Sequence, residues 1–566
     1  MTESLFLISS IIGLGILLLP QKISLLGLLP LLAILTLSMI MFIVVLSSYR
    51  EPMGRFLRSN PFFKARDPIV DIGEQMFHNS RQIKFSLIFI LLINAVFVYI
   101  ACMNILSNVL FQYHKRFIDM FSNQSEILLS AILFVFIVGL SLFLFIWDIR
   151  NRKRVLEDDE QERYIKGILK IATLLMRFSG ILGVWLFFAL LGDFDLPNIS
   201  TKILANLILI IFSFAVPIGF KQYILYSSIE GGAFGPGQNL FERLEMGSEN
   251  ELKTTSETMI IAIGLIIVSI IVGFVIFSQG QVENLVDLGS ILWIPPDNFF
   301  DGFQKICSIL STCIFAFEAY GLFRVIKYES EQGGGVNNLK KVIIVSIGTS
   351  FLLYLMYLVG LGLTIPVEHI DSGTIFSINI FDSLSGLSEI SGGLLRVFFF
   401  IGIIFTFFTS MNSAYSATIR LSDGITNLVD TYKTGRSNMK VDENSFFARN
   451  RQVISIVGAL IIAFFLSLIP ILTPLDDISF FPDLNAIVGS FFIFLIFPLF
   501  LKAQLYQKEK RYKYGLWAIM TLNLVLFISF IINMIVENPI LGTIFGLFFL
   551  IFMIGLWFSL KTYNDR

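Results

Sequence analysis

The sequence predicts an all-α integral membrane protein, on three observations. Hydrophobic residues make up 55% of the 566 residues and charged residues only 15%, whereas ordinary soluble domains carry about 25% charged residues. The mean hydropathy is +0.79. The apolar residues are also gathered in long runs, and a run of roughly 17 to 25 residues is what a helix needs to cross a bilayer about 30 Å thick. A soluble globular chain is therefore excluded.

Fourteen runs are long and apolar enough to be transmembrane helices. The first is not a cleavable signal, because Met1 to Ser4 contain no basic residue and the run leads directly into a second span. The longest polar stretches, about 20 to 35 residues, are too short to bury a core of their own, so we expect loops and no separate soluble domain. The predicted spans are 4–20, 23–49, 85–112, 126–147, 165–191, 203–229, 257–279, 303–325, 341–365, 393–419, 452–472, 485–501, 514–536 and 540–560.

The distribution of basic residues predicts the orientation of these spans. Lys and Arg in short loops are retained on the cytoplasmic side of a membrane. If the N-terminus is inside, 32 of the 41 basic residues lie in cytoplasmic loops and the C-terminal tail, and four lie in outer loops. We therefore expect a multi-pass protein with both termini in the cytoplasm.

Several kinds of chemistry are excluded by composition. Three cysteines and three histidines, scattered along the chain, are too few for a disulfide framework or a metal site. The net charge of -1 gives no overall attraction for nucleic acid. No cluster of His, Asp or Glu indicates a catalytic site in the membrane. We expect no enzyme, no cofactor and no catalytic residues, and a small solute and the lipid bilayer as partners.

The first span carries two glycines close to its middle, Gly13 and Gly15, and ends at Pro20. Each glycine costs a helix about 1 kcal/mol relative to alanine, so the backbone can unwind here. Unwound backbone at membrane depth occurs where it lines a site, as in transporters. The alternative is close packing of two helices through small residues.

The string from Gly13 to Pro20 resembles the first helix of the amino acid/auxin permease family, within the amino acid-polyamine-organocation superfamily. Four further stretches are similar to family motifs in the same order, and one of them resembles a motif in helix six of the proton-coupled amino acid transporters. These four are 71–77, 315–319, 378–381 and 483–491 with 498–500.

This resemblance implies a LeuT-like core of two inverted five-helix repeats in which helices one and six are broken. Counting back from the last motif makes 303–325 helix six and leaves an inserted helix pair. The resulting division is 1–192 for the first repeat, 193–302 for the insertion, 303–505 for the second repeat and 506–566 for two C-terminal helices. The alternative is that 203–229 is helix six, because residues 213–220 contain strong helix breakers.

The resemblance also implies where a zwitterionic amino acid would bind. A broken helix offers N–H groups to the carboxylate and free carbonyls to the ammonium group. One wall would come from the first span and the other from 303–325, with two phenyl rings as an apolar gate. The expected substrate-binding residues are Ser10, Ile12, Gly13, Leu14, Gly15, Phe315, Ala316, Phe317 and Glu318.

Five residues are candidates for coupling to an ion. Glu318 is an ionisable group deep in a span and could accept a proton. By resemblance, Lys170 or Arg177 could stand in the place of a bound sodium ion, although Arg177 does not readily lose its proton and fits an ion pair better. Thr409 and Ser410 resemble the hydroxyl pair of the superfamily's sodium site; such hydroxyls also often bond their own helix.

The sequence therefore predicts a secondary-active transporter of amino acids or related small zwitterions, driven by a proton or sodium gradient. A plasma membrane location is expected, and the helix pair in 203–279 is a candidate homodimer contact. Two alternatives stay open. One is a sensor that has the same fold and binds amino acids without transporting them. The other is a fourteen-helix flippase for lipid or polysaccharide.

Overall fold

The computed structural model describes nine stretches of the chain together with scattered single residues. The stretches are 15–48, 95–107, 124–152, 159–191, 199–217, 291–317, 336–362 and 451–472, with 92–93 just before the second of them. The described elements are all helical, and each falls on a predicted span. Four of these helices are long and apolar enough to cross a membrane, namely Leu128–Trp147, Ile171–Leu190, Phe299–Phe317 and Lys341–Leu361. The described part is therefore that of an all-helical membrane protein with several spans.

The N-terminal region bends twice before it becomes a long helix. A short helix α2 (Gly15–Leu18) continues into the 3-10 turn η1 (Leu19–Lys22) and the short helix α3 (Ile23–Leu26). Pro20 stands at the start of η1, where its missing N–H costs no helical hydrogen bond. The long helix α4 (Leu28–Ser48) follows. The second predicted span, 23–49, thus has its first residues in the separate helix α3.

The remaining described helices are longer than the predicted spans on at least one side. They are α8 (Gln124–Arg152), α9 (Asp159–Leu191), α10 (Ile199–Ile210) with the π-helical turn η2 (Ile211–Ala215), α14 (Phe299–Phe317), α16 (Val336–Gly362) and α20 (Arg451–Leu472). Since polar residues at a span's end satisfy their own backbone as helix, α8 and α9 extend into the loop predicted between them.

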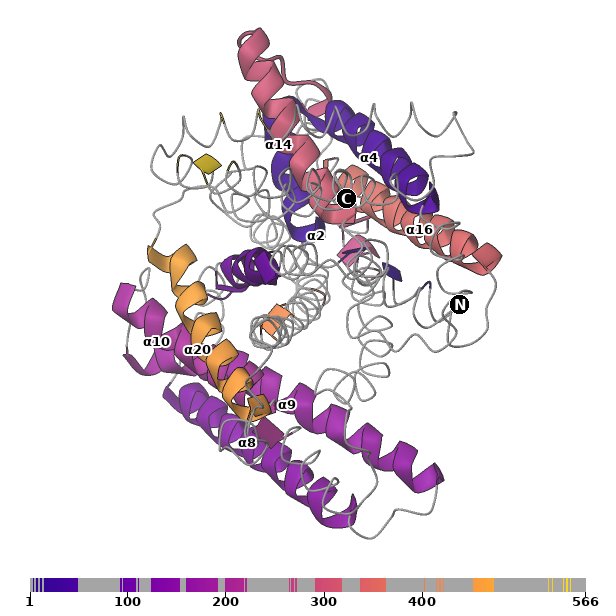
Figure 1. Ribbon diagram of the computed structural model, residues 1–566. Helices are drawn as coiled ribbons and strands as arrows, with labels where there is room; N and C mark the ends of the chain where they lie inside the picture. The colour runs from indigo at the N-terminus through magenta and orange to yellow at the C-terminus, as the bar shows by residue number, and fades with distance from the viewer. Residues whose placement is uncertain are drawn as a thin grey trace, which may run out of the picture.

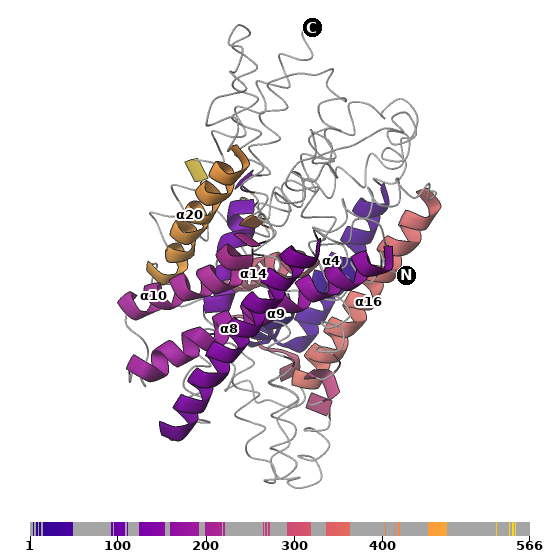
Figure 2. The same ribbon diagram turned by 90° about the horizontal axis from the view of Figure 1, so that it is seen from below.

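Two groups of packed helices can be followed in Figures 1 and 2. In one group α2, α3, α4, α14 and α16 pack together, and α14 contacts all four N-terminal elements, α2, η1, α3 and α4. In the other group α9 packs against α8, α10 and η2, while α10 also contacts α20. The first span therefore lies beside α14, although almost 300 residues of sequence separate them.

The corner between α3 and α4 fixes the chain that leads into α14. Gly27 has φ of 93°, and a Cβ there would lie 2.8 Å from the carbonyl oxygens of Ile291 and Leu292. The Ile294 N–H donates to the Leu26 carbonyl at 3.0 Å. Only glycine combines this backbone conformation with so close an approach, so the residues before α14 are held against the corner between α3 and α4.

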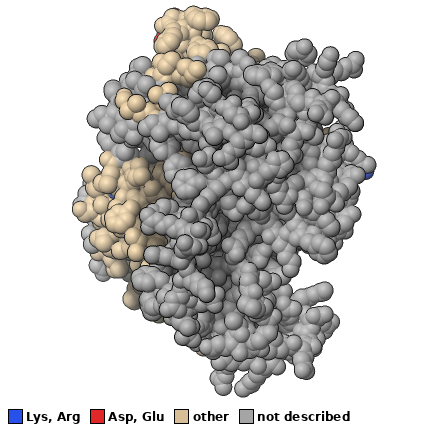
Figure 3. Space-filling view, in the orientation of Figure 1, with Lys and Arg blue, Asp and Glu red and all other residues tan. Residues whose placement is uncertain are grey.

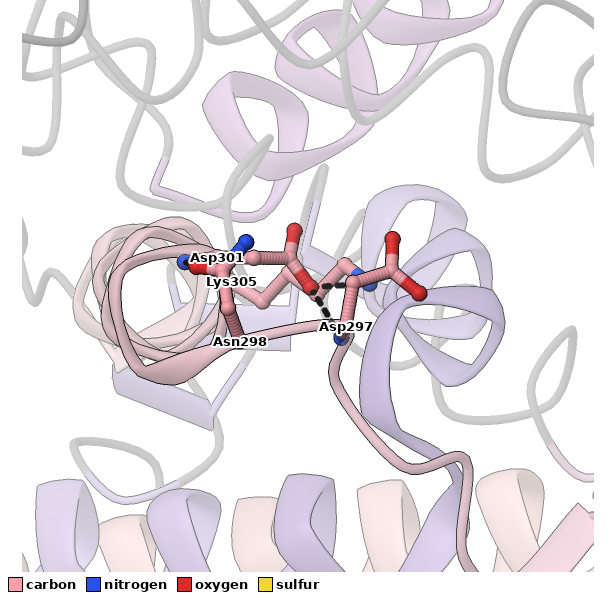
Figure 4. A network of polar contacts seen from close by, with 4 residues as sticks. All are labelled: Asp297, Asn298, Asp301 and Lys305. Atoms are coloured by element: carbon pink, nitrogen blue, oxygen red, sulfur yellow. Dashed lines mark hydrogen bonds and ion pairs between the residues drawn. The ribbon is translucent and has the colours of Figure 1, made fainter.

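Polar contacts at the start of α14 define where this helix begins (Figure 4). The Asn298 side chain accepts a hydrogen bond from the Asp301 N–H at 2.9 Å, which is an N-cap contact. Asp301 in turn accepts from the Asp297 N–H and pairs with Lys305 at 2.8 Å. These contacts satisfy backbone donors that have no partner within the helix.

The surface of the described helices is apolar. On the face of the molecule shown in Figure 3, almost all of the described residues are neither basic nor acidic. Large hydrophobic side chains are exposed along α8, among them Val135, Phe136 and Phe143. In the apolar stretch that could cross the membrane, only 22% of α8 is buried, against 72% of α9. Helix α8 therefore presents most of its surface to lipid, and α9 lies inside the bundle.

Candidate functional site

The two walls expected for the site come into close contact at Gly15. A Cβ on Gly15 would lie 2.7 Å from the Cβ of Ala316 and 2.8 Å from its Cα. It would also lie 2.6 Å from the hydroxyl oxygen of Tyr354. Distances this short leave no room for any side chain at position 15. The glycine thus permits backbone contact between the first span and α14.

A tyrosine from a third helix completes this junction. Tyr354 of α16 is 0% exposed, and its hydroxyl lies 2.9 Å from the carbonyl oxygen of Ile11, 3.3 Å from that of Ile12 and 3.0 Å from that of Ala316. The hydroxyl has one proton, so it donates to one carbonyl at a time. Four oxygen atoms therefore meet around a single donated proton.

The ring of Tyr354 is held by aromatic packing. Phe317 meets it edge-on, with ring centroids 5.7 Å apart and planes at 87°. Phe317 also packs against Phe42 of α4 at 6.1 Å. Edge-to-face contacts of this kind are favourable. The last residue of α14 thus packs between α4 and α16 and fixes the position of the tyrosine.

Buried polar residues continue along α14 away from this junction. Lys22 is only 3% exposed, and its ammonium group donates to the Ser308 hydroxyl at 2.9 Å. Ser311 and Thr312 donate to the Ser308 carbonyl within their own helix. Lys22 lies between the predicted spans 4–20 and 23–49, in an expected outer loop, but the structure buries it in η1 against α14. Its charge therefore lies inside the bundle, between η1 and α14.

A second glycine contact lies in the other group of helices. A Cβ on Gly180 of α9 would lie 2.5 Å from the Ser213 hydroxyl oxygen and 3.3 Å from the Phe212 Cβ. Ser213 is buried within η2, and its hydroxyl has no hydrogen-bond partner in the described part of the chain. A π-helical turn often marks a functional position. This turn is the described part of the alternative helix six.

The predicted site residues divide into those that the structure describes and those outside it. Ile12, Gly15, Phe315, Ala316 and Phe317 are described, are all buried, and come from the two elements that meet at Gly15. The structure places them close together, where the first span meets α14. The predicted residues Ser10, Gly13, Leu14, Glu318, Thr409 and Ser410 lie outside the described residues.

The two basic candidates for ion coupling belong to α9. Arg177 is buried, at 5% exposed, although it is always charged. Lys170 lies in the same helix, about two turns earlier, and its side chain is outside the described part. The main packing partners of α9 are α8, α10 and η2. These are not the elements that meet at Gly15.

Sequence reasoning missed Tyr354 and the buried position of Lys22. A signal for the tyrosine was available, because it lies near the middle of the apolar span 341–365. A tyrosine at that depth must find a hydrogen-bond partner for its hydroxyl. Nothing in the sequence says which carbonyls it meets, since those of Ile11 and Ile12 are more than 340 positions away and that of Ala316 is 38 positions away, on another helix.

The helices and the junction define a class of protein: a multi-pass membrane protein whose interior gathers backbone carbonyls and polar side chains between spans. Residues 251–558 match the family model described as amino acid permease. No curated protein matches the chain. The match covers a little over half of the 566 residues, and the chain belongs to the amino acid permease family.

Membership fixes several conclusions at a coarse level. The family lies within the amino acid-polyamine-organocation superfamily, has a LeuT-like fold, and consists of amino acid transporters rather than enzymes. The protein is thus an integral membrane amino acid permease, and the predicted superfamily and general function are confirmed.

Proposed function

We propose that the protein is a secondary-active transporter that moves amino acids by alternating access, with its substrate site where the first span meets α14. The observation that carries this proposal is the junction of Gly15, Ala316 and Tyr354. A transporter of this fold binds its substrate near the midplane, between two discontinuous helices. The junction supplies close backbone approach and carbonyl acceptors in a buried place, which is what such a site requires.

We assign helix six of the core to 303–325. In an inverted repeat the equivalent helices of the two halves face each other across a pseudo-two-fold axis. The contacts of α2 with α14 and of α4 with α16 fit this relation, because each pair then joins equivalent members of two repeats. The contacts of the alternative helix, 203–229, fit this relation less well. Its described parts, α10 and η2, pack chiefly on α9 and α20 and not on the first span. The core repeats would then be 1–192 and 303–505, with 193–302 inserted and 506–566 appended.

The substrate's ammonium group is proposed to bind the carbonyls at this junction. Four oxygens and one donated hydroxyl proton make the place rich in acceptors, and an ammonium group brings three N–H donors. Bonds from a charged donor are roughly twice as strong as neutral ones. Ser10, Gly13 and Leu14 would complete the wall of the first span, and Phe315 and Phe317 would close over the side chain.

Transport is proposed to be driven by a proton or sodium gradient. Glu318 follows directly after the buried end of α14 and is the candidate proton acceptor. Thr409 and Ser410 are the candidate sodium ligands, and Lys170 or Arg177 would replace a sodium ion if transport depends on protons. The burial of Arg177 supports a functional or ion-paired role, because a charge inside a membrane domain is costly.

The finer family and cellular assignments are also proposals. The motifs at 13–20 and 315–319 favour the amino acid/auxin permeases and their proton-coupled members. The distribution of basic residues favours cytoplasmic termini, and the plasma membrane is the proposed location. The inserted pair in 203–279 is proposed as a homodimer contact. A variant lacking these residues that is still dimeric would contradict that assignment.

Uptake by the purified protein in liposomes tests the proposed function. We expect at least one of the twenty amino acids to accumulate when an inward proton or sodium gradient is imposed, and not without a gradient. Binding without uptake would favour the sensor. Failure of all twenty amino acids to bind or accumulate, together with lipid scrambling, would favour the flippase.

Substitutions identify the coupling ion. Glu318→Gln should abolish the pH dependence of uptake while some binding remains, and an unchanged pH profile would contradict a proton role for Glu318. Thr409→Ala with Ser410→Ala should remove sodium stimulation. If the wild-type protein shows no sodium stimulation at all, the sodium assignment is wrong.

A further inference from the structure

We propose that Tyr354 is a positioning residue of the transport site. Its hydroxyl, on α16, shares one donated proton between a carbonyl of the first span and one of α14, and this tie favours the spacing of the two walls that keeps both carbonyls within hydrogen-bond reach. The role in transport rests on the proposed function, but the tie itself can be tested without any substrate.

Geometry carries this proposal. The acceptors of the hydroxyl are the Ile11 and Ala316 carbonyls at 2.9 and 3.0 Å, and these belong to different walls. The hydroxyl has one proton to donate. It can donate this proton to either carbonyl only while both carbonyl oxygens stay within about 3 Å of the hydroxyl oxygen. A separation of about 1 Å would break at least one of these contacts.

Two neighbours enforce this position. Gly15 provides the space for the hydroxyl, since a Cβ there would lie 2.6 Å from the Tyr354 oxygen. Phe317 holds the ring from the other side, with centroids 5.7 Å apart. Each wall thus contributes both a carbonyl acceptor and a residue that confines the tyrosine. The tie joins the two walls and does not anchor either one alone.

The chain supplies its own reporter for separation of the walls. Its three cysteines, Cys102, Cys307 and Cys313, are buried, and none is in a disulfide bond. Cys313 is 0% exposed and lies three residues before Ala316, hence on the same face of α14. Its thiol reacts with a reagent only when α14 moves away from its neighbours.

The experiment measures labelling by N-ethylmaleimide of the full-length protein in which Cys102 and Cys307 are replaced by Ala. We expect Tyr354→Phe to raise the labelling rate of Cys313 about 3- to 10-fold, since loss of one hydrogen bond shifts an equilibrium by roughly that factor. Tyr357→Phe is the matched control, because Tyr357 is buried one turn away on the same helix. It should leave the rate unchanged.

A second reporter separates local opening from general loosening. In a protein that retains only Cys102, which is buried in the helix 95–107, Tyr354→Phe should leave the labelling rate unchanged. An unchanged Cys313 rate in Tyr354→Phe would overturn the proposal. An equal rise at Cys102, or the same rise in Tyr357→Phe, would overturn it too.

A glycine variant keeps the test decisive if Tyr354→Phe does not fold. Gly15→Ala forces the hydroxyl from its place, so it should also raise the Cys313 rate. Gly348→Ala in α16, which has open space around it, should not. If the wild-type protein in liposomes takes up no amino acid but the variants show these labelling changes, the proposed function is contradicted and the role of Tyr354 in joining the walls is supported. If uptake is normal but labelling is unchanged in the variants, the proposed function is supported and the role of Tyr354 is contradicted.

Discussion

Among the close glycine contacts of the described residues, those at Gly15 and at Gly180 look alike but are built differently. At each, a missing Cβ leaves a hydroxyl oxygen only 2.5 to 2.6 Å from where that atom would be. At Gly15 the hydroxyl is that of Tyr354, and it meets three carbonyls from two elements. At Gly180 the hydroxyl is that of Ser213, which has no hydrogen-bond partner among the described residues.

The difference shows how one small residue serves two purposes. Around Gly15 the neighbours are backbone and Cβ atoms of Ala316, which cannot move unless the helix moves. Around Gly180 the closest atom is the end of a serine side chain. The first contact therefore sets the distance between two walls of the proposed site. The second allows α9 and η2 to pack closely, as small residues do in membrane bundles.

The largest expected effect is that of Gly15→Val. Its branched side chain would separate α14 from the first span, and we expect loss of amino acid binding, seen as loss of thermal stabilisation by any of the twenty amino acids. Gly139→Val is the control, because Gly139 lies on exposed α8 with open space around it. Binding of wild-type strength in Gly15→Val would mean that this glycine only packs helices.

A smaller effect is expected from Gly180→Ala, which should lower the free energy of unfolding by about 1 to 3 kcal/mol, as overpacking does. Adding Ser213→Ala removes the clashing oxygen and should restore most of that loss. Denaturant titration in detergent micelles measures both variants.

The same double replacement at the other contact should behave differently. Tyr354→Phe removes an oxygen near Gly15 but leaves the Ala316 backbone 2.8 Å from the new Cβ. Gly15→Ala should therefore not be rescued by Tyr354→Phe. Equal rescue at both contacts would contradict the distinction between them.

Removing each hydroxyl alone should change stability in opposite directions. Tyr354→Phe breaks a buried hydrogen bond and should lower the free energy of unfolding by about 1 kcal/mol. Ser213→Ala removes a buried hydroxyl that lacks a partner in the described structure, and should raise it by up to about 1 kcal/mol. The two single variants are compared in the same titration. Changes of the same sign would show that Ser213 has a partner in the membrane.

The smallest effect is expected at the start of α14, far from both glycines. Lys305→Ala removes the exposed ion pair with Asp301. Exposed pairs of this kind are screened by water and salt, so thermal stability and amino acid binding should stay unchanged. A clear loss of binding would instead place the beginning of α14 in the substrate path.

Much of the fold could be predicted from the sequence, because span length and apolar character are local properties. Helices α8, α9, α16 and α20 fall on predicted spans, since about 20 apolar residues in lipid can satisfy their backbone only as a helix. The family was also accessible, because its motifs are short and follow one another in order. The same motifs drew attention to Gly15 and to 315–317, which the structure places in contact.

What the sequence could not predict are contacts between distant residues. Two spans are candidates for helix six: 203–229 has helix breakers at 213–220, and 303–325 has the family motif at 315–319, so local patterns do not choose between them. The packing of α14, rather than α10, beside the first span favours 303–325. The place of Lys22 was likewise hidden, because a lysine between two spans normally faces water, and only the packing of η1 on α14 buries it.

The sequence by itself determined that this chain is a helical membrane protein of many spans, because composition and run length depend on nothing beyond the chain and the bilayer. It also determined that two glycines, Gly13 and Gly15, lie close together in the predicted first span. Only the tertiary structure decided what that span meets. The Tyr354 hydroxyl finds its carbonyl partners on helices that begin hundreds of residues apart, and such a meeting depends on how all the intervening spans pack.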